Sequence, residues 1–232
     1  MSKITETQYS KDNNIKSEQR EEIRIEDILE EDTDDVFKML RTFFYKDEPI
    51  NHYIELGVSA ELDSYTQKAL VDKCSFKAVN AHGEIIGVIV NAIAKKPNPN
   101  DPIHSYSAGC KDPKFKKILM LFDYIDEQFN TFKLYPDIAT YLDVAILSVN
   151  ANYRGYGVAG MLMEKTLKYM RENEIKVVRV LCTSFYSARV CEKTGFKKVY
   201  NLPYADYKVD GVTVFKPEKP HEAVQILTQE IN

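Results

Sequence analysis

Hydrophobic and polar residues alternate in some segments of the chain and recur at helical spacing in others. The first two patterned segments predict a strand followed by a helix. Apolar and charged residues alternate at the start of the segment from Ile23 to Ile28, which is typical of a short strand. Asp32 or Thr33 can cap a helix after it, and Pro49 cannot continue that helix. The apolar face of the helix is formed by Val36, Leu40, Phe43 and Phe44.

A second helix and a pair of strands are expected next. Ser59 can cap a helix, because apolar residues recur at helical spacing after it. The runs 76–80 and 85–93 are strand-like, and His82-Gly83 between them predicts a hairpin turn. The segment from Lys95 to Pro113 contains four prolines, so we expect a surface loop that helps to shape a pocket.

The second half of the chain has a clearer pattern. Apolar residues at helical spacing from Phe115 to Phe129 predict a long amphipathic helix. Tyr141–Val149 reads as a strand, Val158–Asn173 as a helix and Val177–Leu181 as another strand, with a glycine-containing loop before the helix. Such a strand–helix–strand unit is expected to cross over with a right hand. A shorter helix is predicted from Ser187 to Thr194.

Composition indicates a globular protein with a substantial core. Apolar residues make up 44% and charged residues 28% of the 232 residues, a balance that argues against a disordered chain. The longest apolar stretch, Ile85–Ala94, is far shorter than the roughly 20 residues of a transmembrane helix. The N-terminal segment lacks the apolar centre of a secretory signal. We therefore expect no membrane partner and a cytoplasmic location.

Charge and cysteine usage exclude further classes of protein. A net charge of −4, with 31 Lys and Arg spread along the chain, gives no cationic stripe for a nucleic acid. The cysteines show no C-x-x-C pairing and the four histidines are isolated, so no metal site is expected. We expect buried free thiols rather than disulfides. These cysteines are Cys74, Cys110, Cys182 and Cys191.

A glycine loop, Arg154–Gly160, connects a predicted strand to the start of a predicted helix. Unpaired N–H groups and the helix dipole attract phosphate at such a position, which predicts a pyrophosphate site. Gly155, Gly157 and Gly160 also fit the G-x-G-x-x-G fingerprint of dinucleotide-binding domains. That fold requires an acidic residue at the end of the next strand, yet residues 181–184 contain no carboxylate. Too few strand–helix units remain after the loop for a Rossmann domain.

Two segments resemble motifs of the GNAT acetyltransferase superfamily. Arg154, Gly157 and Ala159 match its acetyl-coenzyme A signature, Arg-x-x-Gly-x-Ala. The segment that begins at Ser187 and ends in Glu-Lys-x-Gly-Phe at Phe196 is similar to its second motif. The two motifs stand in the order and at the separation that the superfamily has, after the strands expected to form a mixed sheet.

A narrower resemblance is to the insect arylalkylamine N-acetyltransferases. It rests on Phe43–Pro49, on Leu147–Gly155 and on Leu181–Glu192, and it covers nearly the whole chain. The resemblance implies an α+β fold, an α/β/α sandwich whose mixed, mostly antiparallel sheet has helices on both faces and splayed central strands. It also implies a single domain over 21–232. The polar composition of residues 1–20 predicts a flexible tail before that domain.

The chemistry of amine acetylation needs a base, and the resemblance assigns that role to Glu48. An alkylammonium group with a pKa of about 10.4 must lose a proton before its nitrogen can attack a thioester. Glu48 lies after an apolar helix and before Pro49, where partial burial can raise its pKa. From the residues alone, a carboxylate such as Glu48 or its neighbour Asp47 is more often simply exposed to solvent.

The other groups expected in the reaction are hydrogen-bond donors. A backbone N–H where two strands splay can stabilise an oxyanion, and Val149 is the candidate. Many superfamily members have a tyrosine acid where this chain has Cys191. The insect enzymes use two serines nearby; Ser187 matches one, and Thr183 replaces the other while keeping a hydroxyl. Ser187 is alternatively the N-cap of its helix.

The resemblance also implies the residues that bind the two substrates. The acetyl-coenzyme A site comprises Leu147, Ser148, Val149, Arg154, Gly155, Tyr156, Gly157, Val158 and Ala159. The amine pocket comprises Phe44, Tyr45, Met120 and Asp143, the last of which can attract an ammonium group. Aromatic side chains such as these are alternatively part of the core, and Asp143 is alternatively a solvent-facing strand residue.

The expected activity is direct acetyl transfer, in a ternary complex, from acetyl-coenzyme A to a small arylalkylamine such as dopamine, tyramine, octopamine, serotonin or tryptamine. One alternative is an enzyme of the same fold that acetylates polyamines, other aliphatic amines or a protein N-terminus. Another is a binding module that holds coenzyme A or a nucleotide without catalysis. We expect a monomer.

Overall fold

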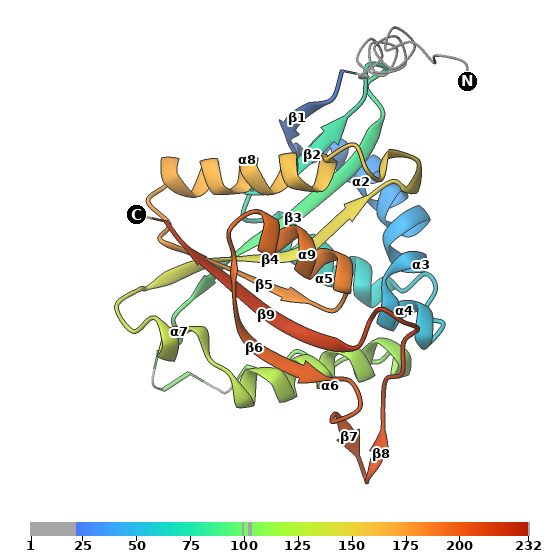
Figure 1. Cartoon of the computed structure of the whole chain (residues 1–232), viewed down its shortest axis with the longest axis vertical. Helices are drawn as coiled ribbons and strands as arrows, with labels where there is room; N and C mark the ends of the chain where they lie inside the picture. The colour runs from blue at the N-terminus through green and yellow to red at the C-terminus, as the bar shows by residue number, and fades with distance from the viewer. Residues whose placement is uncertain (1–21, 99, 102–103, 232) are drawn as a thin grey trace, which may run out of the picture.

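The computed structural model describes residues 22–98, 100–101 and 104–231, so the tail predicted at 1–20 lies outside the described residues. One seven-stranded sheet runs through the molecule in the order β1-β2-β3-β4-β5-β9-β6 (Figure 1). Its strands are β1 (Arg24–Asp27), β2 (Phe76–Val79), β3 (Ile85–Lys95), β4 (Thr140–Val149), β5 (Val177–Cys182), β6 (Lys197–Pro203) and β9 (Ala223–Glu230). A separate two-stranded hairpin is formed by β7 (Lys208–Val209) and β8 (Val212–Thr213).

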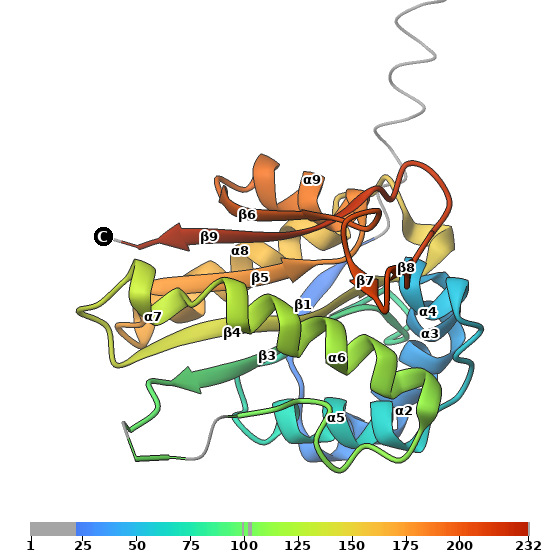
Figure 2. The same cartoon turned by 90° about the horizontal axis from the view of Figure 1, so that it is seen from below.

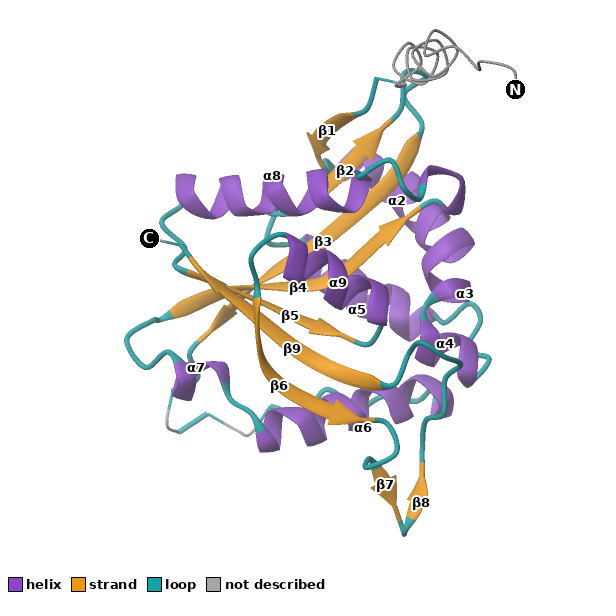
Figure 3. Cartoon of the chain, in the orientation of Figure 1, coloured by secondary structure: helices purple, strands orange, loops and turns teal. Residues whose placement is uncertain are grey.

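Helices cover both faces of this sheet, each above its own hydrophobic core (Figures 2 and 3). Leu162 of α8 and Cys191 of α9 lie in one core, and Val36 of α2, Leu62 of α5 and Ile125 of α6 lie in the other. The expected α+β sandwich is therefore confirmed. The helices are α2 (Thr33–Met39), α3 (Tyr45–Asp47), α4 (Pro49–Tyr53), α5 (Ala60–Leu70), α6 (Pro113–Gln128), α7 (Thr131–Leu134), α8 (Val158–Glu172) and α9 (Phe185–Lys193), with 3-10 turns η1 (Glu30–Asp32) and η3 (Ala151–Tyr153) and a π turn η2 (Leu40–Phe44).

The central strands β4 and β5 splay apart, as expected. They pair in parallel only from Leu142–Val178 to Val144–Val180, whereas every other neighbouring pair in the sheet is antiparallel. Beyond Val144, β4 continues along β3 and diverges from β5 (Figure 1). A register shift in the β3–β4 pairing leaves Ala145 as an extra residue at this point, which is a β-bulge that bends the strand. A gap opens between the two strands after the bulge.

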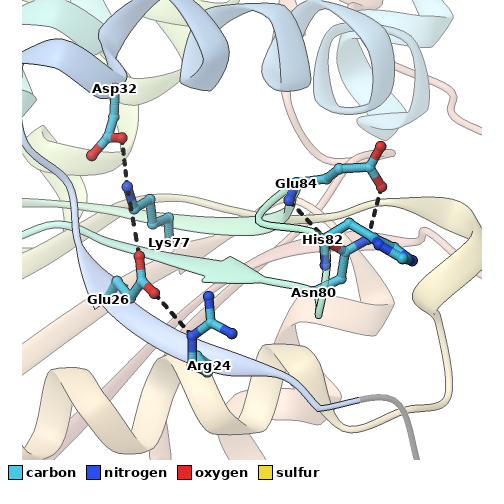
Figure 4. A network of polar contacts seen from close by, with 7 residues as sticks. All are labelled: Arg24, Glu26, Asp32, Lys77, Asn80, His82 and Glu84. Carbon is cyan, nitrogen blue, oxygen red and sulfur yellow. Dashed lines mark hydrogen bonds and ion pairs between the residues drawn. The ribbon is translucent and has the colours of Figure 1, made fainter.

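The predicted hairpin between β2 and β3 is confirmed, and Asn80 holds it. The side-chain oxygen of Asn80 accepts the N–H groups of His82 (3.0 Å) and Glu84 (2.9 Å), and its amide donates to Glu84 Oε2 (2.8 Å) (Figure 4). The same amide donates to the Tyr153 hydroxyl at 3.0 Å. Because Tyr153 directly precedes the glycine loop, the hairpin helps to fix the position of that loop.

The edge of the sheet is held by charges on β1 and β2. Lys77 of β2 forms ion pairs with Asp32, at the start of α2, and with Glu26 of β1 (Figure 4). Glu26 also pairs with Arg24.

Within the described ranges, no helix is both long enough and apolar enough to span a membrane.

Several details differ from the sequence-based expectations. The first helix has the predicted extent, but a π turn at 40–44 interrupts it. Pro49 both ends that helix and begins the next, since proline is favoured at the first helical position. The hydrophobic pattern did not indicate α7 or the strands after 197. Three of the four cysteines are buried free thiols as expected, but Cys110 is only partly buried.

Candidate active site

Glu48 occupies the turn between α3 and α4, and the local sequence explains why its side chain points inward. It is the N-cap of α4, and its Oε2 accepts the backbone N–H of Asn51 at 2.6 Å. Pro49 fixes the first helical residue, so the chain turns sharply at Glu48. Only 8% of Glu48 is exposed. The structure therefore places a carboxylate inside the protein at a helix N-terminus.

Burial raises the pKa of Glu48 above its usual range, and contacts with the Thr183 hydroxyl and with the N–H groups of Asn51 and Ile50 oppose that rise. The second carboxylate oxygen, Oε1, is buried and has no hydrogen-bond partner of regular geometry among the described residues. An unpaired buried acceptor is costly unless a ligand satisfies it. Glu48 thus has the burial and the free oxygen of a general base.

Thr183 lies directly after β5, on the other side of the site, and Tyr204 holds it there. The Tyr204 hydroxyl donates to the backbone carbonyl of Thr183 at 2.7 Å. Tyr204 is buried, and burial followed by the nearby charge of Glu48 raises the pKa of its phenol well above the usual value. The structure therefore brings together Glu48, Thr183 and Tyr204. Sequence reasoning missed Tyr204, because no motif marked the segment after β6.

Ser187 lies in the first turn of α9 and does not cap that helix. Ser184 is the N-cap, and its hydroxyl accepts the N–H of Tyr186 at 3.1 Å. Ser187 Oγ donates instead to the carbonyl of Ser184 at 2.9 Å. The alternative reading of Ser187 as an N-cap is therefore wrong, because the helix starts at Phe185, two residues earlier than predicted.

Cys191 is fully buried on α9, with its sulfur 3.8 Å from that of Cys182. Contact with Cys182, together with burial, raises the pKa of the Cys191 thiol far above its usual value. Such a thiol is a poor proton donor at neutral pH. The position at which many superfamily members have a tyrosine acid therefore offers no equivalent acid in this chain.

The glycine loop has the backbone that its sequence predicts. Gly155 and Gly157 have φ angles of +87° and +81°, and Gly157 is the N-cap of α8. A Cβ atom at Gly155, Gly157 or Gly160 would meet no atom within 4 Å, so the space over these residues is open. The left-handed backbone is what requires glycine at the first two positions. Open space over a helix N-terminus fits a diphosphate group.

Close packing holds α8 against the sheet beneath the loop. A Cβ atom on Gly87 of β3 would lie 2.9 Å from Cγ1 of Val158, so only glycine allows the helix to begin this near to the strand. The side chain of Val158 is buried in the core, whereas Tyr156 is exposed. Ala159, in the next position of the helix, is partly buried.

An ion pair joins the glycine loop to the residue beside Glu48. Arg154 donates to the carboxylate of Asp47. Both side chains are substantially exposed, so the pair contributes little to stability. The guanidinium of Arg154 is therefore accessible at the loop where a diphosphate group fits.

The end of β4 turns two backbone N–H groups toward the gap. Asn150 N–H donates to the carbonyl of Ile86 in β3 at 2.8 Å. Because hydrogen-bonding directions alternate along a strand, Leu147 and Val149 then point their N–H groups to the opposite edge. That edge faces β5, from which β4 has already parted. Ser148 is buried and points its N–H toward β3.

The residues expected in the amine pocket have different surroundings. Tyr45 is 1% exposed, lies in the core and donates its hydroxyl to Asp63, so its surroundings are those of a core residue. Phe44 is half-buried and its ring meets that of Tyr45 edge-on. Met120 is 40% exposed on α6. Asp143 is partly buried on β4 with its Oδ1 shielded from solvent; desolvation raises the pKa of its carboxyl group and Arg179 opposes that rise.

Comparison with known proteins connects this geometry to a family. Residues 33–196 match the acetyltransferase (GNAT) family. The crystal structure of arylalkylamine N-acetyltransferase 2 from Aedes aegypti has a TM-score of 0.84 and 31% sequence identity, covering 90% of this chain and 99% of that chain.

Two further solved structures support the fold. Mosquito arylalkylamine N-acetyltransferase like 5b has a TM-score of 0.81 and 20% identity, covering 90% of this chain and 100% of its own. Drosophila melanogaster polyamine N-acetyltransferase, an enzyme that catalyses the formation of N-acetylagmatine, has a TM-score of 0.76 and 22% identity, with coverage of 90% and 100%. At these identities the likeness concerns the fold alone.

Proposed function

Because this chain belongs to the GNAT acetyltransferase family, we propose that it transfers the acetyl group of acetyl-coenzyme A to the primary amine of a small arylalkylamine. The observation that carries this proposal is the buried Glu48 carboxylate, whose Oε1 is unpaired beside Thr183. A primary ammonium group can donate a proton to that oxygen. Dopamine, tyramine, octopamine, serotonin and tryptamine are the candidate substrates.

Acetyl-coenzyme A supplies an activated acetyl group, and the residues of this chain fit its diphosphate. Open space covers Gly155 and Gly157 at the start of α8, and the exposed guanidinium of Arg154 stands beside them. The backbone from Tyr156 to Ala159 would hold the phosphate oxygens. Leu147 and Val149 would bind the rest of acetyl-coenzyme A through their N–H groups, which face the gap between β4 and β5. Ser148 lies between these two residues.

Different residues of the chain would carry out the separate steps of the acetyl transfer. Glu48 removes a proton from the ammonium group, and its raised pKa makes it a stronger base than an exposed glutamate. The N–H of Val149 stabilises negative charge on the carbonyl oxygen. Thr183 and Ser187 provide the hydroxyl groups that would act as acids in the reaction. A thiolate leaving group needs only weak assistance, since its conjugate acid has a pKa of roughly 8.5.

The preference for an aromatic amine is supported by likeness to the Aedes aegypti enzyme, at 31% identity over 90% of this chain. A substrate panel tests it. We expect release of free coenzyme A thiol with tyramine and dopamine at a kcat/KM well above that with spermidine or agmatine. A preference for spermidine or agmatine would assign the chain to the polyamine class. Binding of acetyl-coenzyme A without thiol release from any amine would indicate a binding module.

A further inference from the structure

A small cavity lies where β4 and β5 part. It has a volume of about 30 Å³, enough for one or two water-sized groups. Tyr65, Tyr106 and Phe122 form aromatic walls, and Asp143 and Arg179 provide its charged groups. Tyr106 comes from the proline-containing loop, so the expectation that this loop helps to shape a pocket is confirmed.

The two charged side chains are only partly satisfied. Arg179 is 4% exposed; it donates from Nη1 to the Tyr141 hydroxyl and from Nη2 to Asp126, both at 3.0 Å. Its Nε lies 4.0 Å from Asp143 Oδ1, and neither atom has a hydrogen-bond partner within the described part of the chain. One donor and one acceptor therefore remain unpaired at the cavity. Leaving both without a partner is costly in a buried site.

A hydroxyl group complements this pair of atoms. Its hydrogen can be donated to Asp143 Oδ1, and its lone pair can accept the N–H of Arg179 Nε. An ammonium or guanidinium group can only donate, and the positive charge of Arg179 repels it. The charges of Asp143 and Arg179 offset one another, while the carboxylate of Asp126 is engaged by Nη2 and partly exposed. A second cation on the substrate would thus gain little here.

The distance to the proposed reaction centre suits an arylalkylamine. Arg179 and Thr183 lie four residues apart along β5 and its end, which is about 13 Å of extended chain. An amine nitrogen near Glu48 and Thr183 could therefore extend an aromatic ring past Leu181 toward the cavity. The aromatic walls favour a ring in that direction.

Resting on the proposed function, we propose that Asp143 and Arg179 together recognise a hydroxyl group at the end of the substrate distal to its amine. Arg179 is thereby a specificity-determining residue. It favours phenolic arylalkylamines over the same amines without a hydroxyl group, and it disfavours diamines and polyamines.

The test compares three amines that differ in this feature: tyramine, β-phenethylamine and agmatine. With the wild-type chain we expect kcat/KM for tyramine to exceed that for β-phenethylamine by about 10-fold or more, and agmatine to be the poorest substrate. In Arg179→Met the tyramine to β-phenethylamine ratio should fall toward one, and agmatine should improve relative to both. The matched control is Arg171→Met, which replaces an exposed arginine on α8. This variant should keep the wild-type ratio of tyramine to β-phenethylamine.

The outcomes separate this inference from the proposed function. Equal kcat/KM for tyramine and β-phenethylamine in the wild-type chain would overturn the inference while arylalkylamine acetylation stands. A preference for agmatine would overturn both the inference and the arylalkylamine substrate class. Absence of turnover with every amine would instead refute the proposed function. Calorimetry with acetyl-coenzyme A shows whether Arg179→Met is folded; if it is not, the wild-type ratios decide alone.

Discussion

The hydroxyl of Tyr204 donates a hydrogen bond to the backbone carbonyl of Thr183 at 2.7 Å. This bond connects the segment after β6 to the end of β5, and it holds Thr183 where its hydroxyl contacts the Glu48 carboxylate. Three segments that are distant in sequence thus meet at one buried carboxylate. The proposed chemistry depends on that arrangement.

Removing the Tyr204 hydroxyl should loosen this arrangement. Tyr204→Phe leaves a buried carbonyl without its donor, so the free energy of unfolding should fall by about 1–2 kcal/mol. The kcat/KM for the amine should fall several-fold, because Thr183 is less well positioned. Thermal unfolding and steady-state kinetics measure the two effects. Tyr124→Phe, which changes a partly exposed tyrosine on α6, should alter neither.

Replacing the proposed base should have a large effect that depends on pH. Glu48→Gln keeps an oxygen for the N–H of Asn51 but removes the base, so kcat/KM at neutral pH should fall by about 10²–10⁴. The loss should shrink at high pH, where more amine is already unprotonated. Asp47→Asn is the matched control and should retain kcat at saturating acetyl-coenzyme A. An equal loss at all pH values would contradict the base role.

Thr183 should lower the pKa of the proposed base, Glu48, rather than act as the base itself. The contact with its hydroxyl lowers the pKa of Glu48 against the effect of burial. Thr183→Val removes that contact, so the acid limb of the kcat/KM profile should move to higher pH.

Ser187→Ala provides the comparison, because Ser187 donates to the Ser184 carbonyl. The Ser187→Ala variant should leave the acid limb of the pH profile of kcat/KM at its wild-type position. If both single variants and the double variant keep wild-type turnover, the hydroxyl groups only shape the site.

The same carboxylate should lower the stability of the fold at neutral pH. Burial raises the pKa of Glu48 in the folded protein above the value of 4.5 expected for an unfolded chain. Between those two values the folded state binds the extra proton, so the free energy of unfolding falls as pH rises through the folded pKa. Glu48→Gln should therefore have a higher Tm than the wild type at pH 7, and this advantage should vanish below pH 4.5. A Tm difference independent of pH would argue against a buried, titrating carboxylate.

The glycine loop should tolerate a side chain poorly. Gly157 has a φ of +81°, and Gly157→Ala should cost about 1–2 kcal/mol of stability because an L-residue is strained there. Calorimetry should also show weaker binding of acetyl-coenzyme A, since the first N–H groups of α8 shift. Gly211→Ala, at a φ of +78° in the β7–β8 turn, carries the same strain and should leave that affinity unchanged.

The sequence predicted the elements whose hydrophobic pattern is local. The strand–loop–helix–strand unit from β4 to β5 has clear periodicity and a glycine loop, and it is confirmed within one or two residues. The end of the first helix near Glu48 was also predicted, because Pro49 cannot continue a helix.

What the sequence could not predict depends on contacts between distant segments. Tyr204 meets Thr183 only because β6 pairs with β9 and β9 pairs with β5. Arg179 reads as an ordinary charged residue in a strand, and only the fold places it beside Asp143 and Asp126. The start of α9 was misplaced because Ser184 and Ser187 are both good N-cap residues.

The central claim, that this chain acetylates an arylalkylamine, is tested most directly by incubating it with acetyl-coenzyme A and tyramine and identifying the product by mass spectrometry. We predict N-acetyltyramine together with an equal amount of free coenzyme A, and neither product without enzyme. Wild-type chain that binds acetyl-coenzyme A but yields no acetylated amine from tyramine or any other arylalkylamine would contradict the account.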